Sequence, residues 1–340
     1  WNGQQKQINL MKAIIPVAGA GAKLRPLTYT QPKPLIPVAG KPIISFIIDQ
    51  LIASGIQDFV FILGYLGEKI QGYLEQEYPL LNKQFVVQNH RDGSGHAIWL
   101  ARDLLVRDEP VMIVFGDTIV DVDMQLFIDE KESCLGIKRI NDPREFGVVE
   151  LDAHNNILHM VEKPNIPKSN QAMVGMYKIR KAGELIDALD NLIHANIKTH
   201  GEFMLTDGLK EMIKKGLVIK AIEVDNWYDC GKKEILLETN AMLLEKRKNI
   251  SLSHSFPNTI ILEPVNIGEE CKISNAIIGP HVTIGDHSEL KNVIIRNSII
   301  GNQTYLEDII LHESIIGSDS DVIGVKQSLQ IGDNTEIDFS

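Results

Sequence analysis

The apolar positions of residues 11–245 fall into short runs that alternate with longer amphipathic stretches. Strands are predicted by the runs KAIIPV, FVFIL, FVVQ, VMIVFGD, LGIKRI, GVVEL and VIKAIEV. Helices are predicted over residues 43–54, 68–76, 97–106, 182–194, 205–215 and 234–248. This alternation predicts an α/β domain with a mainly parallel mixed sheet and helices on both of its faces. Ligands of such sheets bind beyond the carboxyl ends of the strands.

The apolar pattern changes after residue 248. Apolar residues now return every five or six positions, as at Ile267, Ile273, Ile278, Ile284 and Leu290. This period is too wide for the alternation of a simple strand and does not fit a helix, but it is typical of the hexapeptide repeat of a β-helix. A loose run of β-hairpins is the alternative, and it would require clearer turn signals than the repeated Ile-Gly steps.

The composition is that of an ordinary globular protein. The chain has 340 residues, of which 44% are hydrophobic and 23% are charged. No apolar run approaches the roughly 18 residues of a membrane helix, and the net charge of −11 argues against a broad nucleic-acid-binding surface. The three cysteines lie far apart and have no metal-ligand spacing, so we expect a reducing, cytoplasmic location. The polar residues 1–10 are expected to be an extension ahead of a natural start at Met11.

The clearest chemical signal lies near the beginning of the chain. The first apolar run leads directly into a loop that contains Gly19 and Gly21, and cations follow at Lys23, Arg25 and Lys33. An apolar strand that enters a glycine loop presents backbone N–H groups to a phosphate. The cations supply the positive charge that a triphosphate requires. We therefore predict a phosphate-binding site in this segment.

The same segment resembles the signature of the sugar-phosphate nucleotidylyltransferases, G-x-G-T-R-L-x-P-L-T followed by P-K-x-L-x-P-V. The chain reads GAGAKLRPLT and then PKPLIPV, so it differs at Ala22, where the family has Thr or Ser, and at Lys23, where it has Arg. The resemblance covers nearly the whole chain from Met11 and is greatest to the long-form glucose-1-phosphate thymidylyltransferases. It implies a Rossmann-like nucleotidyltransferase domain at residues 11–248 and a short left-handed β-helix at residues 249–340.

The resemblance also implies where the nucleotide binds. The backbone of the glycine loop is expected to hold the triphosphate, at Ala18, Gly19, Ala20 and Gly21. The segment QNHRDGSGHAI resembles the base-binding loop of the family and implies that Gln88, Gly93 and Gly95 hold the base. The amide of Gln88 offers a donor and an acceptor to a pyrimidine, and the glycines would let the backbone approach the ring. A plain strand-to-helix turn is the alternative for this segment.

Two aspartates are the candidate metal ligands. Asp117 follows the apolar run VMIVF and a glycine, where a carboxylate can hold a hard cation or can simply cap a helix or close a turn. The family pattern W-x-D-x-G recurs as WYDCG around Asp229. The resemblance therefore implies that Asp117 and Asp229 bind Mg²⁺ as catalytic residues. It also implies that Lys23 binds the triphosphate and that Lys33 neutralises charge at the α-phosphate.

The motifs FGVVELD, VEKP, SNQAMVGMYKI and GEFMLTD resemble the sugar-phosphate site of the family. They imply sugar-phosphate-binding roles for Gly147, Glu162, Lys163, Gly175 and Thr206. Lys163 is expected to contact the phosphate and Glu162 the sugar hydroxyls, although neighbouring Glu and Lys residues are often a solvated pair. In GEFMLTD, Met204 replaces a glutamate that lies near the sugar pocket in the family, so the identity of the sugar stays open.

The implied reaction transfers a nucleoside monophosphate from dTTP or UTP to a sugar-1-phosphate such as glucose-1-phosphate, and it releases pyrophosphate. Thymine and uracil share one pairing edge, so a UTP-dependent uridylyltransferase is an alternative. A catalytically silent nucleotide-sugar-binding subunit is another, because Ala22, Lys23 and Met204 depart from the family pattern. We expect homo-oligomers to form through the β-helix, and we expect no nucleic-acid or membrane partner.

Overall fold

The computed structural model describes residues 11–246 and 256–325. The predicted extension at residues 1–10 and the end of the predicted helix 234–248 lie outside the described residues.

The chain divides into two compact units, and the division falls within its last helix. The first unit comprises Trp1–Ile36 and Lys41–Leu236. The second unit comprises Pro37–Gly40 and Leu237–Ser340.

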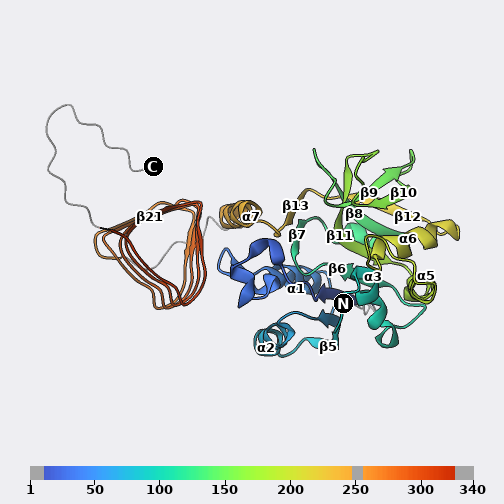
Figure 1. The fold of residues 1–340 in the computed structure, drawn as a ribbon, viewed down its shortest axis with the longest axis horizontal. Coiled ribbons are helices and arrows are strands. Elements are labelled where there is room, and N and C mark those ends of the chain that lie inside the picture. Colours follow the sequence, from blue (N-terminus) through green and yellow to red (C-terminus); the bar gives the residue numbers. More distant parts are fainter. Residues whose placement is uncertain (1–10, 247–255, 326–340) are drawn as a thin grey trace, which may run out of the picture. The chain divides into compact units, whose positions relative to one another are not determined.

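The first unit is built on a nine-stranded mixed sheet (Figure 1). Its strands are β1 (Lys12–Val17), β4 (Asp58–Leu63), β5 (Asn82–Val87), β6 (Val111–Val114), β8 (Ser133–Arg139), β9 (Gly147–Leu151), β10 (Ile157–Glu162), β11 (Gln171–Ile179) and β12 (Ile219–Glu223). β1 lies parallel to β4 and β6, and β5 continues the parallel half beyond β4. β11 pairs antiparallel with β6, β8 and β9, while β12 runs parallel to β8. The sheet is therefore parallel around β1 and mixed around β11.

Helices cover both faces of this sheet. The helices of this unit are α1 (Ile43–Ala53), α2 (Gly67–Glu77), α3 (Ser94–Leu100), α4 (Gln125–Asp129), α5 (Ala182–His194) and α6 (Leu205–Lys214). A further helix, α7 (Lys233–Lys246), contains the division between the units. α3, α5 and α6 share one core with strand residues such as Ile14 and Val60. Ile15 and Phe61 alternate onto the opposite face and are also fully buried. Within the described ranges, no helix is both long enough and apolar enough to cross a membrane.

Helix α3 corrects one predicted boundary. It begins at Ser94 and ends at Leu100, whereas the pattern predicted a helix over residues 97–106. The first turn accepts Gly95 because that glycine fits against backbone atoms of Phe203 and Met204, where a Cβ atom would come within 2.9 Å of them. A separate 3-10 turn follows α3, so the predicted helix is two short elements.

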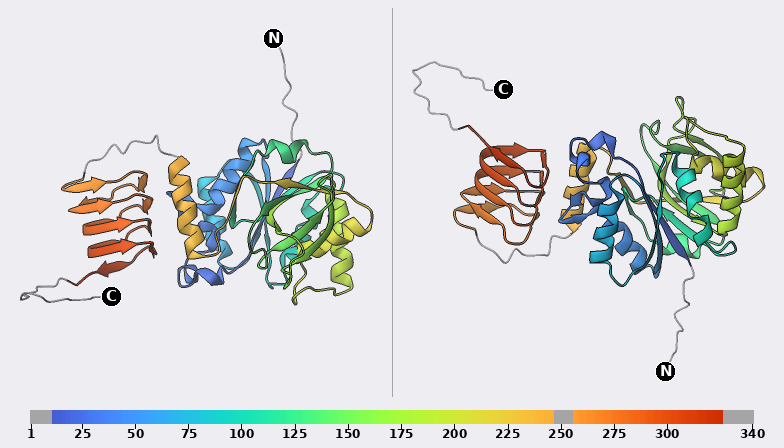
Figure 2. Two further views of the ribbon diagram at one scale, coloured as in Figure 1. Left: turned by 90° about the horizontal axis from the view of Figure 1, so that it is seen from above. Right: turned by 60° about the horizontal axis from the view of Figure 1, so that its bottom comes forward.

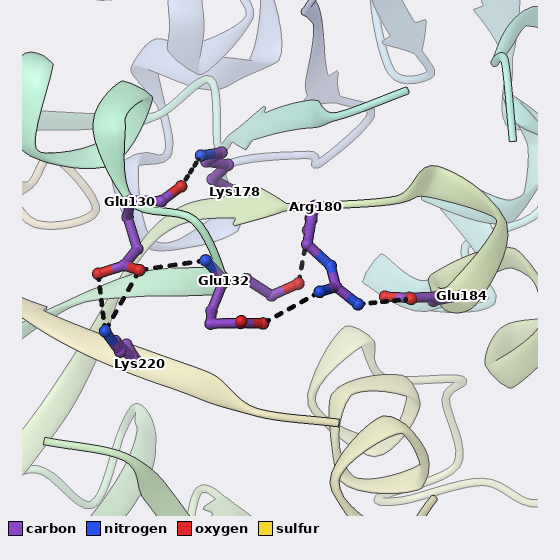
Figure 3. A network of polar contacts seen from close by, with 7 residues as sticks. Glu130, Glu132, Lys178, Arg180, Glu184 and Lys220 are labelled. Carbon is purple, nitrogen blue, oxygen red and sulfur yellow. Dashed lines mark hydrogen bonds and ion pairs between the residues drawn. The ribbon is translucent and has the colours of Figure 1, made fainter. Parts of the chain in front are cut away.

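A polar network joins β11 and β12 to the chain that follows α4 (Figure 3). Lys178 is buried and donates hydrogen bonds to the backbone carbonyl groups of Ile128, at 3.1 Å, and Glu130. The carboxylate of Glu130 pairs with Lys220 of β12 at 3.2 Å. Arg180 adds ion pairs to neighbouring glutamates. Burial lowers the pKa of Lys178 from its ordinary value.

The second unit contains stacked coils of short parallel strands (Figure 2). The strands are β14 (Thr259–Ile261), β15 (Val265–Ile267), β16 (Lys272–Ser274), β17 (Ala276–Ile278), β18 (Val282–Ile284), β19 (Glu289–Arg296), β20 (Ile299–Ile300), β21 (Tyr305–His312), β22 (Ile315–Ile316) and β23 (Asp321–Ile323). Neighbouring coils are 16 or 17 residues apart, as from Ile277 to Ile294 and from Leu290 to Leu306. The inner face is aliphatic and buried, for example at Ile284. This arrangement confirms the predicted β-helix and is consistent with the left-handed form.

Candidate active site

A cavity of about 510 Å³ opens in the first unit. Its walls come from the segments that follow the carboxyl ends of β1, β5 and β6, and from β9, β11 and α6. Of the residues that the sequence predicted for the site, the cavity is lined by Ala18, Gly19, Gly21, Lys23, Lys33, Gln88, Gly93, Asp117, Gly147, Glu162, Lys163, Gly175, Thr206 and Asp229. Ala20 and Gly95 are not among the lining residues.

The glycine loop forms one end of the cavity. Gly21 has a left-handed backbone with φ of 60°. A Cβ atom there would lie 2.9 Å from the Thr28 side chain and 3.1 Å from that of Lys33, so glycine is needed both for conformation and for space. The hydroxyl of Thr28 donates to the carbonyl oxygen of Gly21 at 2.9 Å and fixes the turn. The loop therefore packs closely against the side chains of Thr28 and Lys33.

Lys33 lies between two carboxylates. Its Nζ is 2.7 Å from Oδ2 of Asp117, which follows β6, and 3.3 Å from Oδ1 of Asp229. Asp229 ends β13 (Asn226–Asp229), which pairs antiparallel with β7 (Thr118–Asp121) and thereby places the aspartate opposite Thr118. The structure thus brings together three residues that are widely separated in the sequence.

The electrostatics of this trio favour a charged lysine. Burial acts to lower the pKa of Lys33, but the charges of Asp117 and Asp229 offset it, and the pKa is raised overall. Burial raises the pKa of Asp229, and the nearby charge of Asp117 adds to this rise, whereas Lys33 opposes it. When both carboxylates are ionised, the trio has a net charge of −1, which a further cation can neutralise.

The carboxylates of Asp117 and Asp229 fit a hard cation. Both line the cavity and both side chains are partly exposed to it. Carboxylate oxygens are the ligands that Mg²⁺ prefers, and Mg²⁺ commonly takes only one or two of them and fills its shell with water and substrate phosphates. The described residues contain no group of three or more His, Cys, Asp or Glu side chains that could hold a metal alone. A cation here would therefore take its remaining ligands from water or from substrate phosphates.

Gln88 offers a defined hydrogen-bonding group at the end of β5. Its Nε2 donates to the carbonyl oxygen of Gly93 at 3.1 Å and contacts Nδ1 of His96 at 3.1 Å. A carbonyl oxygen only accepts hydrogen bonds, so the nitrogen of the amide must face Gly93. Burial lowers the pKa of His96, which favours the neutral ring that can accept the second hydrogen. The amide oxygen of Gln88 is then left to accept a hydrogen bond from a ligand.

The glycines of the QNHRDGSGHAI segment lie against the backbone of residues 203–204. A Cβ atom on Gly93 would lie 2.5 Å from the carbonyl oxygen of Phe203, and Gly95 is packed against the same segment. Gly95 also donates its N–H to that carbonyl oxygen at 2.8 Å. Both glycines therefore allow α3 to pack against residues 202–204, and Gly93 lines the cavity as well.

The predicted sugar-phosphate residues also line the cavity. The hydroxyl of Thr206 donates to Oε2 of Glu162 at 2.5 Å. A Cβ atom on Gly147 would lie 3.1 Å from the same oxygen, which shows how closely β9 and β10 approach. Gly175 has φ of 78° and lies against the ring of Phe115. Met204, which stands where the family has a glutamate, does not line the cavity, whereas its neighbour Leu205 does.

Several lining residues were not predicted. Phe146 packs edge-on against Trp227, with ring centroids 4.6 Å apart, and Phe115 packs against Tyr177. Phe146 could have been found as the neighbour of Gly147 in FGVVELD. Glu145 also lines the cavity, and no motif marks it.

The fold and the site together define an α/β protein with a cavity beyond the carboxyl ends of its parallel strands and with a C-terminal β-helix. A family model described as nucleotidyl transferase matches residues 12–246. The chain belongs to this nucleotidyl transferase family.

Relatives in other organisms share both parts of the chain to different extents. The bifunctional protein GlmU of Methanocaldococcus jannaschii is 37% identical over 262 residues, which cover 76% of this chain and 60% of the relative. The chain thus spans about three fifths of that protein. A glucose-1-phosphate thymidylyltransferase of Streptomyces griseus is 26% identical over 315 residues, which cover 85% of this chain and 87% of the relative.

A solved structure shares the fold of the first unit. A UDP-glucose pyrophosphorylase complexed with UDP-glucose superposes with a TM-score of 0.62 at 23% identity. The match covers 70% of this chain and 99% of that one. At this identity the likeness establishes the fold only.

Proposed function

We propose that the protein transfers a nucleoside monophosphate from dTTP or UTP to a sugar-1-phosphate, with glucose-1-phosphate as the first candidate, and that it releases pyrophosphate. The observation that carries this proposal is the position of Lys33 between Asp117 and Asp229 in the cavity. The glycine loop and the Glu162–Lys163 pair line the same cavity. One pocket can therefore receive both a triphosphate and a sugar phosphate.

The residues of the chain have separate tasks in this reaction. The sugar-phosphate oxygen attacks the α-phosphorus, and Lys163 and Glu162 hold the sugar phosphate so that this oxygen is in line. Lys33 keeps its positive charge and stabilises the charge that develops on the α-phosphate. Asp117 and Asp229 would hold Mg²⁺, which when bound supplies further charge neutralisation at the phosphates. No covalent intermediate on the protein is required, because alignment and charge neutralisation suffice.

The hydrogen bonds of Gln88 are compatible with a uracil or thymine base. Both hydrogens of its amide are engaged by Gly93 and His96, so the side chain can only accept. Guanine N1–H and the amino groups of cytosine and adenine are donors too, so this contact alone does not select the base. The N3–H of thymine or uracil can donate to the amide oxygen of Gln88. The two pyrimidines differ by a methyl group away from this edge, so both dTTP and UTP satisfy it. The name of the Streptomyces relative makes dTTP the first nucleotide to test.

The reaction is tested by mixing the protein with Mg²⁺, glucose-1-phosphate and each nucleoside triphosphate in turn, and by measuring pyrophosphate. We expect turnover with dTTP or UTP and little with CTP or ATP. The Lys33→Met variant, purified in the same way, controls for contaminating enzymes. Silence with every nucleotide and with a panel of sugar-1-phosphates would refute the proposal and favour a nucleotide-sugar-binding subunit. Such a subunit would have no need of Lys33 and its two aspartates.

We also propose that the protein self-associates through the β-helix. Ile260, Ile277, Ile294 and Ile310 occupy matching positions on successive coils, and three of them are exposed. A row of exposed aliphatic side chains suits symmetric packing of identical chains. Light scattering after size-exclusion chromatography tests this idea. Ile310→Asp should reduce the measured mass, and an unchanged mass would exclude this row from the interface.

A cytoplasmic location is proposed from the cysteines. Cys134, Cys230 and Cys271 do not form disulfides. Burial raises the pKa of Cys134 to about 12, so it stays an unreactive thiol. Free thiols of this kind fit a reducing compartment.

A further inference from the structure

Two lysines form ion pairs with a single carboxylate beside the glycine loop. Nζ of Lys23 lies 2.7 Å from Oε2 of Glu145, and Nζ of Lys232 lies 3.0 Å from Oε1 of the same residue. The pairs with Lys23 and Lys232 lower the pKa of Glu145, and the pair with Glu145 raises the pKa of Lys232. Three segments that are distant in the sequence thus place two ammonium groups on opposite oxygens of one anion.

This cluster, Lys23–Glu145–Lys232, adjoins the phosphate end of the cavity. Lys23 lies in the turn Ala22–Leu24 that directly follows Gly21, and both Lys23 and Glu145 line the cavity. Lys232 follows Gly231, which also lines the cavity. A Cβ atom on Gly231 would lie 3.4 Å from Nζ of Lys33 and from Oδ1 of Asp229. Lys232 does not itself line the cavity, but its Nζ lies 3.0 Å from Glu145, which does. Both ammonium groups therefore lie beside the glycine loop that we expect to bind the triphosphate.

The contacts within the cluster are easily exchanged. The side chains of Lys23, Glu145 and Lys232 are 64%, 51% and 52% exposed. Exposed ion pairs contribute little free energy because water competes with them. A diphosphate group carries more negative charge and more acceptor oxygens than one carboxylate, and its hydrogen bonds with ammonium groups are charge-assisted. A polyphosphate can therefore take the place of Glu145.

Lys232 also accounts for an unusual residue in the loop. Lys23 stands where the family resemblance has Arg, and a lysine lacks the planar fork with which arginine holds two phosphate oxygens at once. A second ammonium group on the same anion restores two-point contact. The structure supplies this second group from Lys232.

We propose that Lys232 is a further substrate-binding residue, which together with Lys23 binds the β- and γ-phosphates of the nucleotide and the pyrophosphate product. Glu145 holds the two ammonium groups in place until a polyphosphate displaces its carboxylate. This proposal rests on the proposed function, since it assigns the leaving-group end of the same pocket. No bond is made or broken by these three residues.

Calorimetric titration with inorganic pyrophosphate and Mg²⁺ tests the cluster without turnover. Lys232→Ala should weaken pyrophosphate binding about tenfold, as expected for the loss of one charge-assisted contact. Glu145→Gln should tighten it several-fold, because the competing charge is gone while the shape is kept. The matched control is the exposed pair Lys214–Glu211 on α6, 2.6 Å apart. Lys214→Ala and Glu211→Gln should leave the affinity unchanged.

Two results would overturn the proposal: an unchanged affinity in Lys232→Ala, or weaker binding in Glu145→Gln, which would make the carboxylate a part of the site itself. Circular dichroism of each variant establishes that it is folded. Kinetics separate this proposal from the proposed function. If the enzyme turns over and Lys232→Ala leaves the KM for nucleotide unchanged, the cluster is wrong and the function stands. If pyrophosphate binds with the expected dependence and no nucleotide is turned over, the cluster stands and the function is wrong.

Discussion

Two buried lysines of the first unit, Lys33 and Lys178, have different partners for their ammonium groups. Lys33 faces the carboxylates of Asp117 and Asp229, which offset the effect of burial and raise its pKa. Lys178 faces two backbone carbonyl groups, and burial prevails, so its pKa is lowered. Both side chains are less than a tenth exposed, so the difference comes from their partners.

The difference shows how a buried cation acquires a function. Carbonyl groups satisfy the hydrogen bonds of an ammonium group but carry no net charge, so they fix β11 and the chain after α4 and do no more. Two carboxylates hold the full positive charge of Lys33 at the wall of a cavity, where a phosphate or a metal ion can take over part of their negative charge. We therefore expect Lys33 to matter for turnover and Lys178 for stability.

The largest expected effect is the loss of turnover in Lys33→Met. This change keeps the length of the side chain but removes its charge, and kcat should fall about a hundredfold or more, in line with the loss of one group that stabilises developing charge. Steady-state kinetics measure it. Lys178→Met is the matched control, because it removes an equally buried ammonium group, and its kcat per folded molecule should equal that of the wild type. Equal kcat values for both variants would abolish the distinction between the two lysines.

Asp229→Asn should give the next largest effect. The variant loses one of the two charges that sustain the pKa of Lys33 and one of the two candidate metal ligands. We expect kcat to fall roughly tenfold to a hundredfold and the Mg²⁺ concentration for half-maximal rate to rise. A Mg²⁺ titration of activity measures both. Asp225→Asn, an exposed neighbour outside the cavity, should follow the wild-type curve. An unchanged Mg²⁺ requirement in Asp229→Asn would remove this residue from the metal site.

Lys33 was predictable from the sequence and Lys178 was not. The prolines on both sides of Lys33 and their fixed distance from the glycine loop mark a special lysine. Lys178 lies in the strand segment MYKI, where nothing in the local pattern reveals that its head group finds two carbonyl groups from a different part of the chain. The partners of a buried charge are set by tertiary packing, and a single sequence does not display them.

The same reason separates the predicted and the unpredicted parts of the fold and site. β1 and α5 have the predicted boundaries, because a buried parallel strand and an amphipathic helix each have a strong local period. The cluster of Lys23, Glu145 and Lys232 depends on three loops that meet only in the folded chain. Motifs marked most of the residues that line the cavity, whereas packing determines which other residues join them.

Lys178→Met should lower the free energy of unfolding by about 1–2 kcal/mol, because two buried carbonyl groups lose their charged hydrogen-bond donor. The variant no longer buries a charge, and this gain offsets part of the loss. Urea unfolding followed by circular dichroism measures this change. Lys220→Met serves as the comparison, because Lys220 is more exposed and pairs with Glu130 in the same network. It should cost less than Lys178→Met. Stability equal to the wild type in Lys178→Met would mean that the carbonyl groups gain nothing from the lysine.

The smallest effect is a pair of opposite slopes at alkaline pH. The folded pKa of Lys33 is raised above 10.5, so its contribution to stability is complete below that pH and is lost as the pH rises through the folded pKa. The folded pKa of Lys178 is lowered below 10.5, so the cost of its burial is relieved as the pH rises from the folded pKa toward 10.5. Urea unfolding between about pH 9 and about pH 11 tests both signs, because titrating groups that do not interact with either lysine cancel between wild type and variant. The stability advantage of the wild type should shrink with pH relative to Lys33→Met and grow relative to Lys178→Met. Slopes of the same sign would show that the pKa values of Lys33 and Lys178 are not shifted in opposite directions.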